Sequence, residues 1–90
     1  MLLAWSEFSL TDREDIMDYI SQDNPAAAIA LDDAFEAAAH RACRQPYMYK
    51  LGRFPDTREI VVHPHYVMVY QVQNKALVIL RVLHTAMLWP

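Results

Sequence analysis

The chain has 90 residues, of which 54% are hydrophobic, and it carries a formal net charge of −3. This length suits one domain with a single modest core, and the high apolar content argues against disorder. The net charge excludes a general nucleic-acid-binding protein, which usually has a pI above about 9. The single cysteine, Cys43, excludes an internal disulfide, so we expect one domain, residues 1–90, suited to a reducing compartment.

The first elements of the chain are predicted to be a short strand and a helix. Residues 2–5 form a short apolar run that is typical of a strand. Apolar residues then recur at helical spacing and predict a helix over residues 9–22. Ser9 and Asp12 resemble a capping box with Asp in place of Glu, which places the start of this helix at Ser9.

A second helix is predicted over residues 25–44. Asn24 is a good N-cap residue, and Pro25 fits the first helical position because no backbone N–H is needed there. Pro46 ends the helix. Because the link between the two helices is short, we expect them to form an antiparallel αα-hairpin.

The last third of the chain is predicted to form three strands. These strands cover residues 58–63, 66–73 and 76–84, and their connections are short enough for antiparallel hairpins. The predicted order is β-α-α-β-β-β. This order is typical of an α+β fold in which an antiparallel sheet packs against the αα-hairpin.

The sequence also limits the location and the chemistry of the protein. Its beginning lacks the basic start and long apolar run of a signal peptide, and no window approaches the roughly 18 apolar residues of a membrane span. We therefore expect a cytoplasmic protein. No P-loop, G-x-G-x-x-G or HExxH motif is present, and the four histidines show no metal-ligand spacing, so we expect neither a cofactor nor a metal.

The charges divide sharply along the chain. Residues 1–36 contain nine acidic residues and one basic residue, whereas residues 37–90 contain seven basic residues and two acidic ones. This division predicts a negative helical face and a positive surface elsewhere. The positive surface could meet an acidic partner or nucleic acid.

Arg58, Arg81 and His84 are the candidates for chemistry. A guanidinium can fork onto phosphate or carboxylate, and an imidazole can act as a general acid or base. The competing interpretations are structural: Arg58 and Arg81 could form ion pairs that stabilise the fold, and His84 could be a packed histidine at the end of a strand. Regular alternation places Arg81 with Leu77, Ile79 and Leu83 and places His84 on the opposite face of the strand, which weakens a catalytic pair unless a bulge intervenes.

The sequence resembles the RelE/ParE superfamily of bacterial type II toxins over nearly its whole length. No single motif is decisive, but the order and spacing of the matching blocks are specific. They are Trp5, Ile16-x-x-Tyr19-Ile20, Asp23-Asn24-Pro25-Ala26-Ala27, Gly52-Arg53, Thr57 to Val62, His63-Pro64-x-Tyr66, Val69-Tyr70, Ile79 to His84, and Trp89-Pro90.

This resemblance implies a plasmid-stabilising toxin that arrests growth and is held by a cognate antitoxin in a hetero-oligomer. The ParE-like branch, which inhibits DNA gyrase without a nuclease site, is favoured because the chain has few lysines before its central strands and no tyrosine near the end of the last one. The RelE-like alternative is a ribosome-dependent mRNA endonuclease, and a non-toxic binding module of the same fold is a further possibility. We expect Arg53, Arg58, Arg81, His84 and Trp89 to contact partners, and Arg58, Arg81 and His84 to be catalytic only in a RelE-like enzyme.

Overall fold

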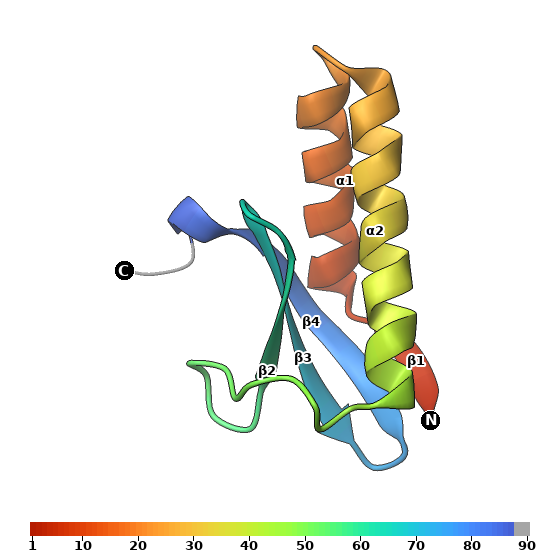
Figure 1. The fold of residues 1–90 in the computed structure, drawn as a ribbon, viewed down its shortest axis with the longest axis vertical. Helices are drawn as coiled ribbons and strands as arrows, with labels where there is room; N and C mark the ends of the chain where they lie inside the picture. The colour runs from red at the N-terminus through yellow and green to blue at the C-terminus, as the bar shows by residue number, and fades with distance from the viewer. Residues whose placement is uncertain (88–90) are drawn as a thin grey trace.

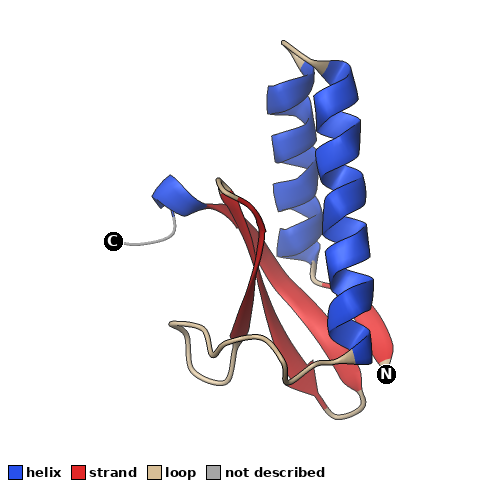
Figure 2. Ribbon diagram, viewed as in Figure 1, coloured by secondary structure: helices blue, strands red, loops and turns tan. Residues whose placement is uncertain are grey.

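A helical hairpin packs against one face of a four-stranded sheet (Figures 1 and 2). The computed structural model describes residues 1–87. Its elements are β1 (Leu2–Trp5), α1 (Glu7–Ser21), α2 (Pro25–Arg44), β2 (Arg58–His63), β3 (Tyr66–Gln73), β4 (Ala76–His84) and a 3₁₀ turn (Thr85–Met87). The predicted β-α-α-β-β-β order is therefore confirmed. Among the described residues, no helix combines the length and apolar character needed to cross a membrane.

The sheet has the order β1-β4-β3-β2. The pairs β2–β3 and β3–β4 are antiparallel, as predicted, but β1 pairs with β4 in parallel. The sheet is consequently mixed, which corrects the expectation of a wholly antiparallel one. The reason is the number of chain reversals. The chain reverses direction at the helical hairpin, at the return from α2 to β2 and at each of the two strand hairpins. Because four is an even number, β4 runs in the same direction as β1.

Helix α1 begins earlier than predicted. Its N-cap is Ser6, whose Oγ accepts a hydrogen bond from the Ser9 backbone N–H at 3.0 Å. Ser6 is also tied to β4, because its N–H donates to the Ile79 carbonyl and its hydroxyl to the Leu80 carbonyl. These long-range bonds fix Ser6 at the junction of strand and helix. Ser9 is therefore buried inside the first turn, and the predicted capping box at Ser9 and Asp12 is wrong.

Helix α2 matches the predicted range. The Asn24 side chain accepts a hydrogen bond from Ala27 N–H at 3.1 Å, and Pro25 occupies the first turn. The alanine-rich face of α2 lies against the sheet, and its small side chains allow the close approach that buries Phe35 completely. The core consists of Phe35, Ala38, Ala39, Ala42, Ile60, Tyr66, Met68, Tyr70, Leu77, Ile79 and Val82.

A bulge changes the alternation of β4 at Leu80. Val69 pairs with Arg81 and Tyr70 with Ile79, so Leu80 has no partner on β3. Before this extra residue, the buried side chains of β4 are Leu77 and Ile79. After it, the buried side chain is Val82. The prediction that Arg81 shares the face of Leu77 and Ile79 is therefore wrong.

Candidate functional site

Arg81 is held in an ion pair at the open edge of β4. Strand β1 covers this edge only as far as Ile79, and α1 takes its place beyond that point. The Asp12 carboxylate accepts from Arg81 Nε at 2.7 Å, from Arg81 Nη2 at 2.9 Å and from Val82 N–H at 2.9 Å. The hydrogen bond that Arg81 donates to Asp12 is the main cause that raises the pKa of Arg81. Asp12 thus completes the edge of the sheet and occupies the guanidinium.

Arg58 is held by backbone carbonyls on β2, two strands away from Arg81. Its Nη1 donates to the Tyr49 carbonyl at 2.6 Å and to the Tyr47 carbonyl at 3.3 Å. The guanidinium carbon also lies 5.4 Å from the centre of the Tyr47 ring, a cation–π distance. Arg58 therefore fastens the segment between α2 and β2 to the sheet.

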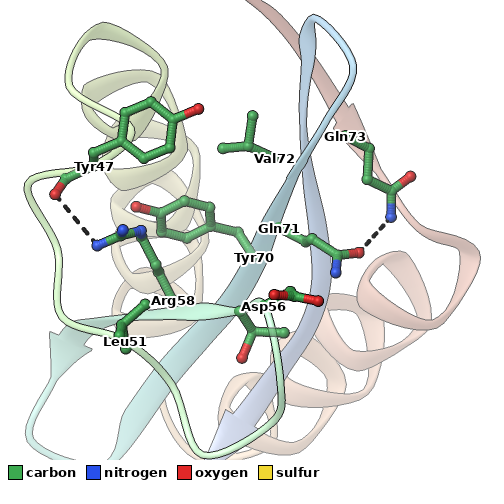
Figure 3. A pocket seen from close by; sticks show the side chains of 9 residues that line it. Tyr47, Leu51, Asp56, Arg58, Tyr70, Gln71, Val72 and Gln73 are labelled. Carbon is green, nitrogen blue, oxygen red and sulfur yellow. Dashed lines mark hydrogen bonds between the residues drawn. The ribbon is translucent and has the colours of Figure 1, made fainter.

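A hollow of about 550 Å³ opens beside Arg58. Figure 3 shows Arg58 and the ring of Tyr70 on its floor, with Tyr47 and Leu51 from the preceding segment along one side. The hydroxyl of Tyr70 donates to the Pro46 carbonyl at 2.6 Å. Burial is the main cause that raises the pKa of Tyr70, so the phenol stays protonated. Backbone carbonyls engage both the Tyr70 hydroxyl and the Arg58 guanidinium, and Asp56 also lines the hollow.

His84 lies in a cluster of rings at the far end of β3 and β4. Its ring stacks on His65 with centroids 5.6 Å apart and meets Tyr66 edge-on at 5.2 Å, and His63 lies 5.5 Å from His65. The Nδ1 atom of His84 accepts a hydrogen bond from Ala86 N–H at 3.1 Å. A neutral ring with Nδ1 accepting carries its proton on Nε2. The Nδ1 atom of His84 is therefore engaged by the backbone.

The remaining predicted contacts are Arg53 and Trp89. Arg53 is exposed, and its backbone N–H donates to Glu59 Oε2 at 3.0 Å. Trp89 lies outside the described residues.

Arg81 and His84 line one hollow of about 480 Å³ together with Tyr66. Arg58 is the candidate catalytic residue that lies apart from His84. Arg58 pairs with Tyr70 across β2 and β3, whereas His84 pairs with Tyr66 across β3 and β4. Four residues of strand separate these positions, which corresponds to about 13 Å. In the part of the chain that the structure describes, no three His, Cys, Asp or Glu side chains form a group able to hold a metal ion.

An apolar groove separates the helical hairpin from the outer end of the sheet. In Figure 1 the hairpin and the strands diverge toward the turn between β2 and β3. The groove has a volume of about 520 Å³, and its walls come from both helices and from β2, β3 and β4. It is lined by Ile20, Ala27, Ala30, Leu31, Ala34, Val62, His63, His65, Tyr66 and His84.

Three features of the site were not predicted from the sequence. Asp12 was interpreted as a capping residue, although it is the partner of Arg81, 69 residues away. Tyr70 and the exposed side chains of Tyr47 and Leu51 were not among the predicted site residues. The one available signal was the density of large apolar residues between Pro46 and Phe54, which is unusual for a connecting loop.

The fold is that of a small toxin of the RelE/ParE superfamily. Residues 3–89 match the model of the family described as ParE toxin of the type II toxin–antitoxin system, parDE. The chain belongs to this family. It is thus the toxin component of a type II toxin–antitoxin module, and its partner is a cognate antitoxin.

Known relatives come from both branches of the superfamily. The chain is 34% identical over 86 residues to Toxin RelE2 of Caulobacter vibrioides, covering 96% of this chain and 97% of the relative. The structure of the chromosomal ParDE system of P. aeruginosa contains a chain that superimposes on this one with a TM-score of 0.81 and 18% sequence identity. The match covers 93% of this chain and 95% of that chain. The YoeB/ParE toxin of Agrobacterium tumefaciens has a TM-score of 0.69 and 15% identity, covering 93% and 98%. These two structural similarities establish the fold alone.

Proposed function

We propose that the protein arrests growth by binding and inhibiting DNA gyrase, without nuclease chemistry. The observation that carries the proposal is that Arg58, Arg81 and His84 are each engaged in their own local contacts. Arg58 also lies outside the hollow that Arg81 and His84 share. The match to the ParE family model supports the same conclusion. A toxin that acts on gyrase works in the cytoplasm.

The argument against RNA cleavage rests on the states of these groups. A general base must offer a lone pair within about 3 Å of the attacking hydroxyl, and cations must surround the same phosphate. The Nδ1 lone pair of His84 is taken by Ala86 N–H. The guanidinium of Arg81 is already paired with a carboxylate, so it would have to abandon Asp12 to reach a phosphate.

The apolar groove is the proposed binding site of the antitoxin. Exposed alanines and Leu31 offer a shallow apolar floor along α2, and the histidine rings form its opposite wall. An amphipathic segment that folds on binding would bury its apolar face there. Such a segment would leave the hollow beside Arg58, at the other end of the sheet, uncovered.

The direct test is supercoiling of relaxed plasmid DNA by purified gyrase. Toxin released from its antitoxin should inhibit the reaction, and adding the antitoxin back should restore it. In cells, DNA synthesis should stop before protein synthesis. Full supercoiling activity at a molar excess of folded toxin would refute the proposal.

The second candidate function is cleavage of mRNA at the ribosome. Two observations favour it: the identity with Toxin RelE2, and the grouping of His84, His65 and Tyr66 at one end of the sheet. Burial raises the pKa of Tyr66, so its phenol keeps its proton and offers no phenolate to act as a base. If His84→Gln and Arg81→Ala abolish growth arrest while the variants stay folded and bind antitoxin, the nuclease function gains and the gyrase function loses support.

A further inference from the structure

The segment between α2 and β2 exposes large apolar side chains. This segment, residues 45–57, is called the connecting loop below. The exposed fractions are 65% for Tyr47, 61% for Met48 and 71% for Leu51, although side chains of this size usually avoid water. Tyr47 and Leu51 line the hollow beside Arg58 (Figure 3). Large apolar side chains exposed close together in one short segment of a small protein are typical of an interaction surface.

The connecting loop is held in place from both sides. At its start, the Tyr70 hydroxyl and the Arg58 guanidinium bind the carbonyls of Pro46 and Tyr49, each at 2.6 Å. Leu51 forms an antiparallel bridge with Arg58. The large side chains are therefore presented by a fixed backbone, which lowers the entropy lost on binding a partner.

The end of the connecting loop is closed by contacts that admit no larger residue. Gly52 N–H donates to the Thr57 carbonyl at 2.7 Å, and the Thr57 hydroxyl donates to the Phe54 carbonyl at 2.7 Å. A Cβ at Gly52 would lie 2.5 Å from Thr57 Oγ1 and 3.1 Å from Glu59 Oε2. Because the backbone is packed this closely, exposure of the apolar side chains does not result from a loose segment.

The charge around the connecting loop is positive. Residues 41–58 contain five basic residues and one acidic residue, Asp56, whereas the helices carry most of the acidic residues. Lys50 lies between the exposed Met48 and Leu51, and its side chain is exposed as well. An acidic patch with apolar residues would complement this surface in both charge and character.

We propose that the connecting loop is the surface with which the toxin docks onto an acidic, apolar-centred patch of the protein that it inhibits. The proposal rests on the proposed function in that gyrase is the expected partner. Tyr47, Met48 and Leu51 enter the contact, and Lys50 with its basic neighbours orients it. The apolar groove stays available to the antitoxin at the other end of the sheet.

The test compares two double variants that remove the same kinds of side chain. Tyr47→Ser with Leu51→Ser alters the connecting loop, and Tyr19→Ser with Ile29→Ser alters the helices. Tyr19 and Ile29 are likewise exposed, at 72% and 56%. The loop variant should need at least about tenfold more toxin for half-inhibition of supercoiling, as expected for loss of a central contact. The helix variant should stay within about twofold of the wild type.

A second pair of variants tests charge and keeps the proposal falsifiable if the loop variant fails to fold. Lys50→Glu should weaken inhibition several-fold at low salt, and the loss should shrink as salt is raised. Lys75→Glu makes the same change in the exposed turn between β3 and β4 and should have little effect. Equal effects of the two reversals, or a loop variant as potent as the wild type, would overturn the proposal.

The experiments distinguish failure of the gyrase proposal from failure of the docking-surface proposal. If the wild type leaves gyrase active but arrests growth, the same variants are compared by growth arrest in cells. Loss of arrest in the loop variant, with arrest kept in the helix variant, supports docking onto another protein. Unchanged growth arrest in the loop variant overturns the proposal. Ribosome-dependent mRNA cleavage that requires the connecting loop also overturns it, because the connecting loop would then bind RNA and not a protein.

Discussion

Replacing Asp12 by alanine should destabilise the protein more than removing its ionic partner does. Asp12 lies on α1 and accepts three hydrogen bonds from β4, two from Arg81 and one from Val82 N–H. Arg81→Ala removes only the side-chain ion pair, because Asp12 can still accept from Val82. Asp12→Ala removes the ion pair and also leaves the backbone donor at the edge of the sheet without its partner.

The two costs can be estimated from burial. The Arg81 side chain is 46% exposed, so solvent screening limits the ion pair to about 0.2–1 kcal/mol. Val82 is 2% exposed, and loss of the partner of a buried donor costs about 1–3 kcal/mol. Asp12→Ala loses both contributions and should therefore lower the free energy of unfolding by about 1–4 kcal/mol. Arg81→Ala should lower it by less than about 1 kcal/mol.

Urea denaturation followed by circular dichroism measures both free energies of unfolding. Thermal unfolding adds a check, because each 1 kcal/mol shifts Tm by about 4–8 °C in a domain of this size. Asp12→Asn keeps an acceptor for Val82 N–H and should fall between the two alanine variants. Asp15→Ala, an exposed acid on the same helix, should stay within about 0.5 kcal/mol of the wild type. Equal losses for Asp12→Ala and Arg81→Ala would show that the backbone contact contributes nothing.

Three further outcomes follow from individual contacts. Gly52→Ala should cost about 1–3 kcal/mol, because its Cβ would lie 2.5 Å from Thr57 Oγ1, and unchanged urea stability would contradict that geometry. Tyr70→Phe should lower the free energy of unfolding by about 1 kcal/mol, because the hydrogen bond to the Pro46 carbonyl is lost. The connecting loop should also become more sensitive to limited proteolysis. Equal cleavage rates in the variant and the wild type would show that Tyr70 does not anchor the connecting loop. Burial raises the pKa of Cys43, so less thiolate is present at pH 8 and alkylation by iodoacetamide should be several-fold slower than for glutathione. A matching alkylation rate would show that the thiol is not shielded.

Most of the fold could be predicted because its signals are local. Asn24, Pro25 and Pro46 delimit α2, and alternating apolar residues with short polar breaks delimit β2, β3 and β4. The start of α1 was missed because Ser6 and Ser9 are equally good caps, and the choice depends on bonds from Ser6 to β4. No local pattern reports a contact of this kind.

The site was less predictable because it depends on pairings across the sheet. The bulge at Leu80 is visible only when β3 and β4 are aligned, yet it decides which side chains of β4 after Ile79 face the core. The sequence presents Arg81 as a charge inside an apolar strand, and this correctly suggested an ion pair. It does not identify Asp12, since nine acidic residues precede the second half of the chain.

The division of charge along the chain acquires a structural meaning from these pairings. Arg81 neutralises an acid of α1, and Arg13 bridges the two helices through bonds to acids of α2 while its guanidinium carbon lies 4.3 Å from the Trp5 ring centre. Arg58 is occupied by backbone carbonyls. Three guanidinium groups that could have gathered around a phosphate therefore stabilise the fold. The surface that remains conspicuous is apolar and basic, around Tyr47, and such a surface suits recognition of a protein better than cleavage of RNA.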